Sequence, residues 1–544
     1  MKLLEKHFEI ALETPDGITK LRELIFNLGI KSKLVPNNSI DVPAIKTLNK
    51  GYSVINNDEY LFDIPKNWSW NFLGSIINVK SSKRIFENDY TFDGVPFYRS
   101  KEIGELSRNG FCEDRLFISK DKFKEIKDKF GVAKQGDILL TSVGSIGGCW
   151  IVDDRDFYYK DGNVTLLEVN NQISSEYLRL FIKSSLFIEQ VKNAVSGTAY
   201  NALTIIKIKS LKIPVPPLEE QKRIVEKIDQ LMLLCDKLEE ERNRKHKLQL
   251  QMNSAAINNL IKANDEKTFN NAWSFIANQF DTLYTVKQNV TDLREVILNL
   301  AMRGKLVLQD DKEQSAIELH KEILVEKNNL IKRGSIRKQK ELTAIKKDEI
   351  TYEVPKNWKW VRLNDFGTWK SGSTPNRSNS SFYDGNIPWV KSGEVKQGRI
   401  KFTSETITDY ALEKCSLHIN PIGSVLIAMY GANIGEAGVL EIEAATNQAV
   451  CACNAYEGID NNYLYNLLLS LKNNFISQGA GAAQPNISRE KIINTVVPLP
   501  PYDEQKRIVK RINQLFELCD KLEKNIEQSS KKKSQILNAV LAQV

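Results

Sequence analysis

The stretch QKRIVEKIDQLMLLCDKLE at residues 221–239 returns almost unchanged as QKRIVKRINQLFELCDKLE at residues 505–523, with fourteen of the 19 positions identical. A proline-rich lead precedes each copy, IPVPPLEE and VPLPPYDE. Apolar residues in both copies step by four and three positions, which is the spacing of a coiled-coil seam. The predicted seam residues are Ile224, Ile228, Leu231, Cys235 and Leu238 in the first copy, and Ile508, Ile512, Leu515, Cys519, Leu522 and Ile526 in the second.

Two further segments are repeated in the same order. IPKNWSW at 64–70 returns as VPKNWKW at 354–360, and LRELIFNLGIKSKLV at 21–35 returns as LREVILNLAMRGKLV at 293–307 with nine of 15 positions identical. Two halves, about 7–262 and 279–544, therefore share one frame, as in a tandem duplication. Between the repeated segments the likeness is weak but ordered, because QGDILLTSVGSIGG at 135–148 has the shape of IGSVLIAMYGANIG at 422–435. A constant frame around a diverged insert suggests that the two inserts recognise two different targets.

The repeated stretch predicts a long helix in each half. A continuous helix over 218–260 would span roughly 65 Å. Glu219, Glu220, Asp503 and Glu504 lie at the expected helix starts, where carboxylates suit the helix dipole. If a two-fold axis relates the halves, the two long helices pair antiparallel and form a spacer. In the alternative arrangement, each helix packs only on its own insert.

The inserts, about 60–215 and 351–500, have the pattern of mixed α/β domains. DILLTSV and SVLIAMY are typical of buried strands, whereas SSEYLRLFIKSSLFIEQVKNAV and DNNYLYNLLLSLKNNFI are typical of amphipathic helices. The predicted fold is α+β, with two mixed α/β domains separated by a long antiparallel two-helix coiled coil. The predicted segments are an N-terminal helical segment (1–50), the first α/β domain (51–216), a central helical region with the coiled-coil helix 218–262 (217–350), the second α/β domain (351–500) and a C-terminal coiled-coil helix (501–544). We expect the charged stretch 311–350 to be a solvated helix or linker rather than a DNA-binding arm.

Composition limits the function without fixing it. The chain has 76 basic and 68 acidic residues, a net charge of +8 that permits binding to a polyanion but does not demonstrate it. Seven cysteines form no CxxC pair, so a zinc site or disulfide framework is not expected, and Cys451 and Cys453 have the spacing of a buried strand. No apolar run reaches the ~18 residues of a membrane span, and the start does not resemble a signal peptide. We expect a cytoplasmic protein.

No sequence motif of the chain is a convincing catalytic signature. There is no P-loop, and PLPPYDEQ at 498–505 has Leu499 where an amino-methyltransferase motif needs an amide or acid. Glu220-x-Lys222 and Glu504-x-Lys506 mimic part of a nuclease site, but we interpret them as helix-start residues. The paired tryptophans are the same in both halves and are expected to pack rather than stack on bases: Trp68, Trp70, Trp358 and Trp360.

These residues carry a resemblance to the specificity subunits of type I restriction-modification systems. The carriers are the twin PPLEEQKRIVEKI and PPYDEQKRIVKRI segments, the PKNW entries, LREVILNLAMRGKLV, and SGSTPNRSNSSFYDGNIPWVKSGEV at 371–395, over essentially the whole chain. The resemblance implies that each insert reads one half of a split, asymmetric site in double-stranded DNA. It also implies that the helical regions dock two methyltransferase subunits and that a translocase-nuclease subunit joins for cleavage. S-adenosylmethionine, ATP and Mg²⁺ would then be bound by those partners, with no cofactor or metal on this chain.

Candidate DNA contacts are polar or basic residues in segments expected to be loops, since bases are read by amide, hydroxyl and guanidinium groups and phosphates are gripped by cations. In the first insert they are Lys80, Ser81, Ser82, Lys83, Arg84, Arg99, Lys101, Ser142, Ser145, Tyr200 and Asn201. In the second insert they are Lys370, Ser371, Ser373, Thr374, Asn376, Arg377, Lys391, Ser392, Tyr430, Asn433, Gln484 and Asn486. The alternative for each is a solvated turn. Gly144, Gly147, Gly431 and Gly435 are expected to shape turns rather than cradle phosphate.

Three functions remain open on the sequence alone. The first is a non-catalytic DNA-recognition subunit of a methyltransferase-nuclease complex, which the diverged, polar-tipped inserts favour. The second is a coiled-coil adaptor without DNA contact. The third is a free-standing nuclease or methyltransferase. The target bases themselves cannot be deduced, because side-chain to base rules need docking geometry.

Overall fold

The computed structural model describes residues 13–44, 55, 59–160, 162–195, 202–263, 265–338, 342–479 and 486–542. The chain forms two compact units: unit 1 comprises Met1–Lys245 and Ser530–Val544, and unit 2 comprises His246–Ser529. Each unit therefore combines one insert with parts of the helical frame.

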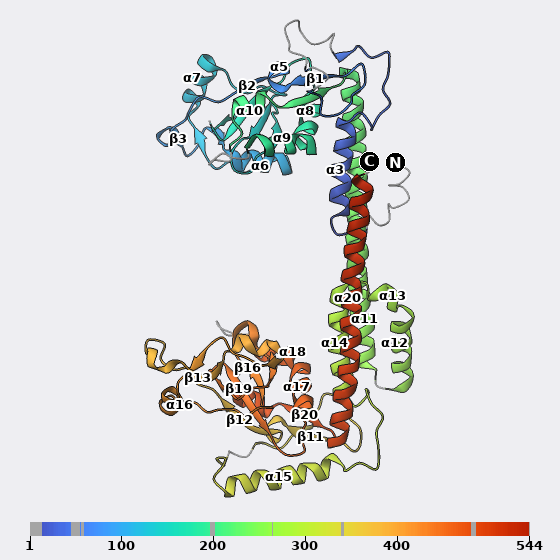
Figure 1. Ribbon diagram of the computed structural model, residues 1–544, viewed down its shortest axis with the longest axis vertical. Helices are drawn as coiled ribbons and strands as arrows, with labels where there is room; N and C mark the ends of the chain where they lie inside the picture. The colour runs from blue at the N-terminus through green and yellow to red at the C-terminus, as the bar shows by residue number, and fades with distance from the viewer. Residues whose placement is uncertain are drawn as a thin grey trace. The chain divides into compact units, whose positions relative to one another are not determined.

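Two long helices cross from one unit into the other. They are α11 (Leu218–Lys262) and α20 (Tyr502–Ala542), which confirms the helix predicted for each half (Figure 1). Each begins directly after its proline-rich lead: the Gln221 amide donates to the Pro217 carbonyl at 2.9 Å, and the Gln505 amide donates to the Pro501 carbonyl at 2.9 Å. Proline suits this position because the first helical amides have no partner within the helix.

The predicted seam residues are buried or half-buried, but in unit 1 the seam packs against a helix that the heptad pattern did not indicate. Ile224 and Ile228 are fully buried, and they face α3 (Gly17–Ile30), where a Cβ built on Gly29 would lie 2.8 Å from Ile228 Cδ1. Arg22 of α3 reaches across to α11, with Nη2 2.6 Å from Asp236 and 2.8 Å from Glu239. The seam is therefore shared with α3, which contains the first part of the repeated segment 21–35 and lies beside α11 (Figure 1).

Unit 2 repeats this contact with α14 (Lys287–Met302) and α20. Arg294 occupies the position of Arg22 in the repeat, and its guanidinium lies 2.5 Å from Asp520 and 2.9 Å from Glu523. Ile508 and Ile512 are buried in the same apolar cluster as Val296 and Leu300 of α14. Two further short helices belong to this part of unit 2, α12 (Glu266–Asn278) and α13 (Phe280–Leu283).

Opposite ends of the two long helices share each core. In unit 1, Val540 near the end of α20 lies in the cluster that holds Ile224 near the start of α11. In unit 2, Leu260 near the end of α11 lies in the cluster that holds Ile508 near the start of α20. Such pairing of opposite ends is what an antiparallel helix pair produces, as the sequence predicts.

The insert of unit 1 is a mixed α/β domain built on two four-stranded sheets, ordered β2-β9-β6-β7 and β3-β5-β4-β8, with β1 and β10 paired separately. Its strands are β1 (Ser69–Phe72), β2 (Asn78–Lys80), β3 (Tyr90–Thr91), β4 (Val95–Tyr98), β5 (Phe117–Ile118), β6 (Ile138–Thr141), β7 (Cys149–Ile151), β8 (Tyr158–Tyr159), β9 (Val164–Glu168) and β10 (Lys212–Val215). Its helices are α5 (Leu73–Ile76), α6 (Ser100–Asn109), α7 (Lys120–Phe130), α8 (Ser175–Lys183), α9 (Ser185–Val195) and α10 (Ile205–Lys209).

The insert of unit 2 has the same plan, with a five-stranded sheet ordered β12-β19-β16-β17-β14, a three-stranded sheet ordered β15-β13-β18, and the pair β11-β20. Its strands are β11 (Lys359–Arg362), β12 (Gly367–Ser371), β13 (Tyr383–Val390), β14 (Arg399–Ile400), β15 (Thr406–Ile407), β16 (Val425–Ala428), β17 (Ala437–Leu440), β18 (Ala445–Thr446), β19 (Val450–Ala455) and β20 (Val496–Leu499). Its helices are α16 (Asp409–Lys414), α17 (Asn461–Ser470), α18 (Lys472–Gly479) and α19 (Arg489–Asn494).

The charged stretch 311–350 contains a largely exposed helix, as the sequence predicts, but one face of that helix is packed. Within its described residues the α-helix is α15 (Ala316–Lys332), and the rest is turns and irregular chain. One face of α15 is not solvated: Leu319 and Ile323 are buried, and Lys327 Nζ lies 3.2 Å from Asp365 of the insert. Its apolar i, i+4 pair packs on the core of unit 2, a contact that the surrounding charges concealed.

A glutamine ties each long helix to its insert. Gln221 Oε1 accepts the Ser174 amide at 2.8 Å, and its Nε2 donates to the Pro216 carbonyl at 2.9 Å. Gln505 does the same with the Asp460 amide at 2.9 Å and the Pro500 carbonyl at 3.1 Å. Ser174 and Asp460 cap the N-termini of α8 and α17. The frame therefore holds both inserts by the same side chain.

Candidate nucleic-acid interface

In unit 2, several polar segments leave the five-stranded sheet at a single edge. β12 ends at Ser371, opposite Cys451, and β16 ends at Ala428, opposite Val450, where β19 begins. The Asn447 amide donates to the Val390 carbonyl at 3.0 Å, which brings the end of β13 to the same place. The candidate residues that follow β12, β13 and β16 are thus brought together.

Unit 1 has the equivalent edge. Lys80 at the end of β2 pairs with Leu166, two residues after Val164, the partner of Thr141. Lys370 pairs with Ala452, two residues after Val450, the partner of Ala428. Lys80 and Lys370 therefore occupy the same position in the two sheets.

Cations are also matched where β4 and β13 end. Arg99 follows β4 and opens α6, and its amide donates to Glu102 Oε2 at 3.0 Å. Lys391 follows β13, and its amide donates to Glu394 Oε2 at 2.8 Å. Both begin a capping box in which a glutamate three residues on satisfies a free amide. Each edge thus carries two cations at matching positions.

The remaining candidates of unit 2 are distributed along this edge. Tyr430 is 43% exposed and forms an isolated antiparallel bridge with Asn486. Lys370, Asn376 and Arg377 are exposed, while Ser371, Ser373, Thr374, Lys391, Ser392 and Asn433 are half-buried. Gln484 lies outside the described residues.

In unit 1, one candidate is wrong. Ser142 is buried, with its hydroxyl 2.6 Å from Thr165 Oγ1 and 3.3 Å from the Leu140 carbonyl, so it belongs to the packing of β6 on β9. It lies one residue past the strand end and still follows the inward alternation of the strand. Ser81, Lys83, Arg84, Lys101 and Ser145 are exposed, and the Ser82 hydroxyl is buried. Tyr200 and Asn201 lie outside the described residues.

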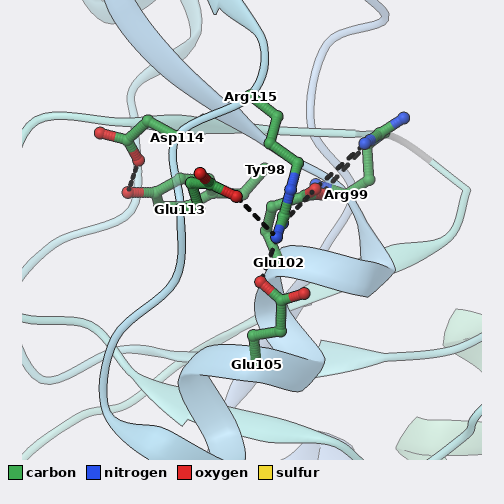
Figure 2. A network of polar contacts seen from close by, with 7 residues as sticks. All are labelled: Tyr98, Arg99, Glu102, Glu105, Glu113, Asp114 and Arg115. Carbon is green, nitrogen blue, oxygen red and sulfur yellow. Dashed lines mark hydrogen bonds and ion pairs between the residues drawn. The ribbon is translucent and has the colours of Figure 1, made fainter. Parts of the chain in front are cut away.

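Arg99 is held by a network of charged side chains (Figure 2). Its Nη2 lies 3.0 Å from Glu102 Oε1, and Arg115 Nη1 reaches the same oxygen at 3.3 Å and Glu105 at 2.8 Å. Glu102 is 1% exposed. Burial alone would raise the pKa of Glu102, but hydrogen bonds from Arg99 outweigh it and the pKa is lowered. A buried carboxylate therefore fixes the guanidinium of Arg99.

A second cation cluster lies on unit 2. Glu405 accepts from Lys391 Nζ at 2.6 Å and from Arg377 Nη1 at 2.5 Å. Hydrogen bonds from Lys391 and then Arg377 lower the pKa of Glu405. Arg377 also lies over two rings, with its guanidinium carbon 4.8 Å from the Tyr383 centroid and 5.1 Å from the Trp389 centroid.

One polar residue at this edge escaped the sequence analysis. Gln448 is exposed, and its Oε1 accepts a hydrogen bond from Thr374 Oγ1. The signal was present, because the polar pair Asn447 and Gln448 interrupts the otherwise apolar run AATNQAVCAC. A polar interruption between two strand-like runs is typical of a loop at a sheet edge.

The frame residues that mimic catalytic groups have structural partners. Glu504 is buried, with Oε2 accepting from Trp358 Nε1 at 2.9 Å and Oε1 accepting from Gln309 at 2.7 Å. Its counterpart Glu220 is likewise buried and accepts from Asn37 at 3.3 Å. Burial raises the pKa of both carboxyls. These contacts agree with the helix-start interpretation.

The other predicted packing roles are confirmed. Trp68, Trp70 and Trp358 are buried, and Trp360 is half-buried. Gly144, Gly147, Gly431 and Gly435 have φ of 78°, 99°, 65° and 79°, so they shape turns that other residues adopt rarely. Cys451 and Cys453 are buried in β19.

A known protein family matches this chain twice, once in each half. Residues 65–248 and 355–531 each match the profile described as "Type I restriction modification DNA specificity domain". The chain is 28% identical to the type I restriction enzyme EcoAI specificity subunit of Escherichia coli, over 93% of this chain and 90% of that protein. It is 26% identical to the EcoEI specificity subunit of the same organism, over 96% and 93%.

Among solved structures, the crystal structure of the HsdS subunit from Thermoanaerobacter tengcongensis matches with 16% identity and a TM-score of 0.42, over 89% of this chain and 98% of that one. None of the helices in the described ranges is both long and apolar enough to cross a lipid bilayer.

Proposed function

The chain belongs to the specificity subunits of type I restriction-modification systems, and from this premise we propose that it selects a bipartite, asymmetric site in double-stranded DNA. The insert of each unit reads one half-site. The edge of the sheet where the polar segments gather is the surface that meets the DNA.

The observation that carries this proposal is the contrast between matched and diverged positions at the two edges. Lys80 and Lys370 match, as do Arg99 and Lys391. The isolated bridges differ, because Val143 pairs with Ala202 in unit 1 whereas Tyr430 pairs with Asn486 in unit 2. Phosphates carry no sequence information and suit cations that stand at the same position in both halves, whereas bases are read by side chains that must differ between half-sites.

We further propose that the chain performs no catalysis itself. Two methyltransferase subunits would bind S-adenosylmethionine and modify the target, and restriction subunits would supply ATP- and Mg²⁺-dependent translocation and cleavage. The buried Glu220 and Glu504 are committed to the frame. Methyl transfer or cleavage by the isolated chain would contradict this part of the proposal.

The frame would also dock the partners. In unit 2, Trp273 and Phe275 of α12 are 49% and 43% exposed, although they lie on a helix of the frame rather than on the insert. Exposed aromatic side chains of this kind are typical of protein interfaces. They support α12 as part of the docking surface for a methyltransferase subunit.

Sequencing of methylated bases in a host with and without the gene tests the reading function. We expect a split motif that disappears without the gene. Replacing residues 351–500 with the insert of another family member should change one half of that motif and leave the other half intact. A simultaneous change in both halves would exclude independent readers. A salt-dependent gel shift with purified methyltransferase would exclude an adaptor without DNA contact.

A further inference from the structure

We propose that Arg377 reads a guanine in the half-site recognised by unit 2. This inference rests on the proposed function and assigns one base contact within it. It is drawn from the way in which the segment 371–377 and its arginine are fixed.

The segment is clamped onto two aromatic residues of β13. Tyr383 donates its hydroxyl to the Pro375 carbonyl at 2.6 Å, and Trp389 donates its indole N–H to the Ser373 carbonyl at 3.3 Å. Trp389 is 1% exposed and belongs to the core. The backbone that carries Arg377 is therefore attached to β13 at two points, one of which is a core residue.

The side chain of Arg377 is held by the same two rings. Its guanidinium lies over Tyr383 and Trp389, and its Nη1 is 2.5 Å from Glu405. The side chain nevertheless remains 55% exposed. A guanidinium has five N–H donors in a fixed plane, so one edge can bind Glu405 while other donors remain for a ligand. Holding the plane in advance reduces the rotamer entropy lost on binding.

Charge favours an anionic or acceptor-rich partner. Glu405 is shared between Arg377 and Lys391, so two cations face one anion and the cluster keeps a net positive charge. DNA is therefore not repelled by Glu405. Guanine presents O6 and N7 as two acceptors in the major groove, which match two parallel N–H donors of arginine.

A phosphate contact would not need this construction. A lysine on a flexible stem can grip a phosphate as a point charge, although arginine also binds phosphate with two donors. Guanine O6 and N7 lie in one plane and are best matched by two parallel donors whose plane is already held, as that of Arg377 is. Unit 1 holds its own segment after β2 in another way, with the Lys83 amide donating to Tyr158 Oη at 2.7 Å. Different clamps at equivalent edges are expected if the two units read different bases.

The test uses the full chain in complex with its methyltransferase subunits. Binding and methylation are measured on duplexes in which each base pair of the split target is changed in turn. We expect Arg377→Lys and Arg377→Ala to lose discrimination at one G·C pair in one half-site, by roughly 5- to 150-fold. Preferences in the other half-site should be unchanged. Lys401→Ala is the matched control, because Lys401 is 68% exposed and pairs with Glu441 on the same domain.

Two outcomes would overturn the inference. A uniform loss across all duplexes, with the salt slope reduced by about one, would assign Arg377 to a phosphate. Unchanged preference at every base pair would show that it reads nothing. Either result leaves the proposed function intact, whereas a wild-type complex without any split target would remove the proposed function itself.

Glu405→Gln provides a second, independent variant, because it retains the size of the anchor and removes its charge. We expect it to weaken discrimination at the same base pair as Arg377→Lys. The double variant should lose little more discrimination at that pair than Arg377→Lys alone, since Glu405 acts on that base pair through Arg377. Any effect through Lys391, which Glu405 also binds, should be uniform across the duplexes. An effect at a different base pair, or purely additive effects, would contradict the positioning role of Glu405. Thermal unfolding of each variant identifies any that are misfolded.

Discussion

Two buried glutamates show how the partners of a side chain shift its pKa. Glu102 and Glu504 are both nearly inaccessible to solvent. Glu102 faces the guanidiniums of Arg99 and Arg115, whereas Glu504 faces the neutral donors of Trp358 and Gln309. The pKa of Glu102 is lowered and that of Glu504 is raised. Their effects on stability should therefore depend on pH with opposite sign.

Glu102→Gln should destabilise unit 1 at neutral pH by about 1–3 kcal/mol, because two guanidiniums lose their charged acceptor. The folded pKa lies below the ordinary value of 4.5, so the folded state binds fewer protons than the unfolded state. The wild-type contribution is present above that value and is lost as pH falls through the folded pKa. Denaturation of both proteins across this range measures it. Glu113→Gln is the control, since Glu113 also pairs with Arg115 but is 80% exposed; an equal loss there would contradict a role for burial.

Glu504→Gln should remove a pH dependence of the opposite direction. The folded pKa of Glu504 lies above 4.5, chiefly because of burial, so the folded state binds more protons above that value. Wild-type stability should therefore fall as pH rises through the folded pKa. The variant lacks this titration. It also places an amide donor against Trp358 or Gln309, so at low pH it should be less stable than wild type. We expect the gap between variant and wild type, measured by Trp fluorescence during denaturation, to narrow with rising pH; a widening gap would contradict the assignment.

The roles of single residues were predictable from the sequence only where both halves carry the same residue. Trp68 and Trp358 were expected to pack because both halves keep them, and they are buried. The prediction that Ser142 contacts DNA was wrong, because a hydroxyl near a strand end can point into the protein as easily as toward solvent. Gln448 was missed because it is not part of a segment that recurs in both halves. Positions that differ between the halves are the ones on which recognition would depend, and there the duplication gives no guidance.

At the scale of elements, a single glycine sets how closely α3 approaches α11. A Cβ at residue 29 would lie 2.8 Å from Ile228 Cδ1 and 3.2 Å from Ile224 Cγ2. In unit 2 the corresponding residue of the repeat is Ala301, which is buried in α14. The unit 2 helices therefore accommodate the methyl group that unit 1 excludes.

Gly29→Ala should destabilise unit 1 although alanine favours a helix by about 1 kcal/mol. Ile228 Cδ1 can swing away, but Ile224 Cγ2 is bonded directly to Cβ and cannot, so overpacking of about 1–3 kcal/mol should outweigh the propensity. The thermal midpoint is the measurement. Gly104→Ala in α6 is the control, because its nearest neighbour is the flexible end of Arg108 at 3.4 Å, and it should be neutral or stabilising. Equal shifts for the two variants would show that packing at Gly29 is unimportant.

Helices and strands were well predicted from the sequence where the spacing of apolar residues was regular. The helix expected over 218–260 spans Leu218–Lys262, and DILLTSV and SVLIAMY contain β6 and β16. The partner of the seam was not predictable, because a heptad pattern shows which face is apolar but not which helix covers it. Likewise α15 has two apolar positions that pack among many charges, and composition alone favoured a solvated helix.

At the scale of the whole molecule, the duplication separates what must be constant from what must vary. Gln221 and Gln505 attach each insert to a long helix through the same two backbone groups, and Arg22 and Arg294 attach each short helix to acidic residues of the repeated stretch. These recurring contacts hold the insert and the short helix to the frame in both units. The sheet edges carry different side chains, which supports the proposal that the two units read different half-sites.

This logic predicts that the long helices set the spacing between the half-sites. Both α11 and α20 cross the boundary between the units, at residues 245–246 and 529–530. Inserting seven residues at both places would lengthen each helix by about 10 Å and keep the heptad seam in register. Since B-DNA rises 3.4 Å per base pair, we expect the methylated motif to gain about three unspecified bases between unchanged half-sites.

Methylated-base sequencing of a host carrying the lengthened chain measures this spacer directly. Three base pairs also rotate the duplex by roughly 100°, so methylation should be slower than in wild type even at the new spacing. An insertion in α11 alone would shift its seam relative to α20 and should abolish modification, which separates a change of length from a loss of pairing. A motif that keeps its original spacer in the doubly lengthened chain would show that the partner subunits, rather than these helices, determine the distance.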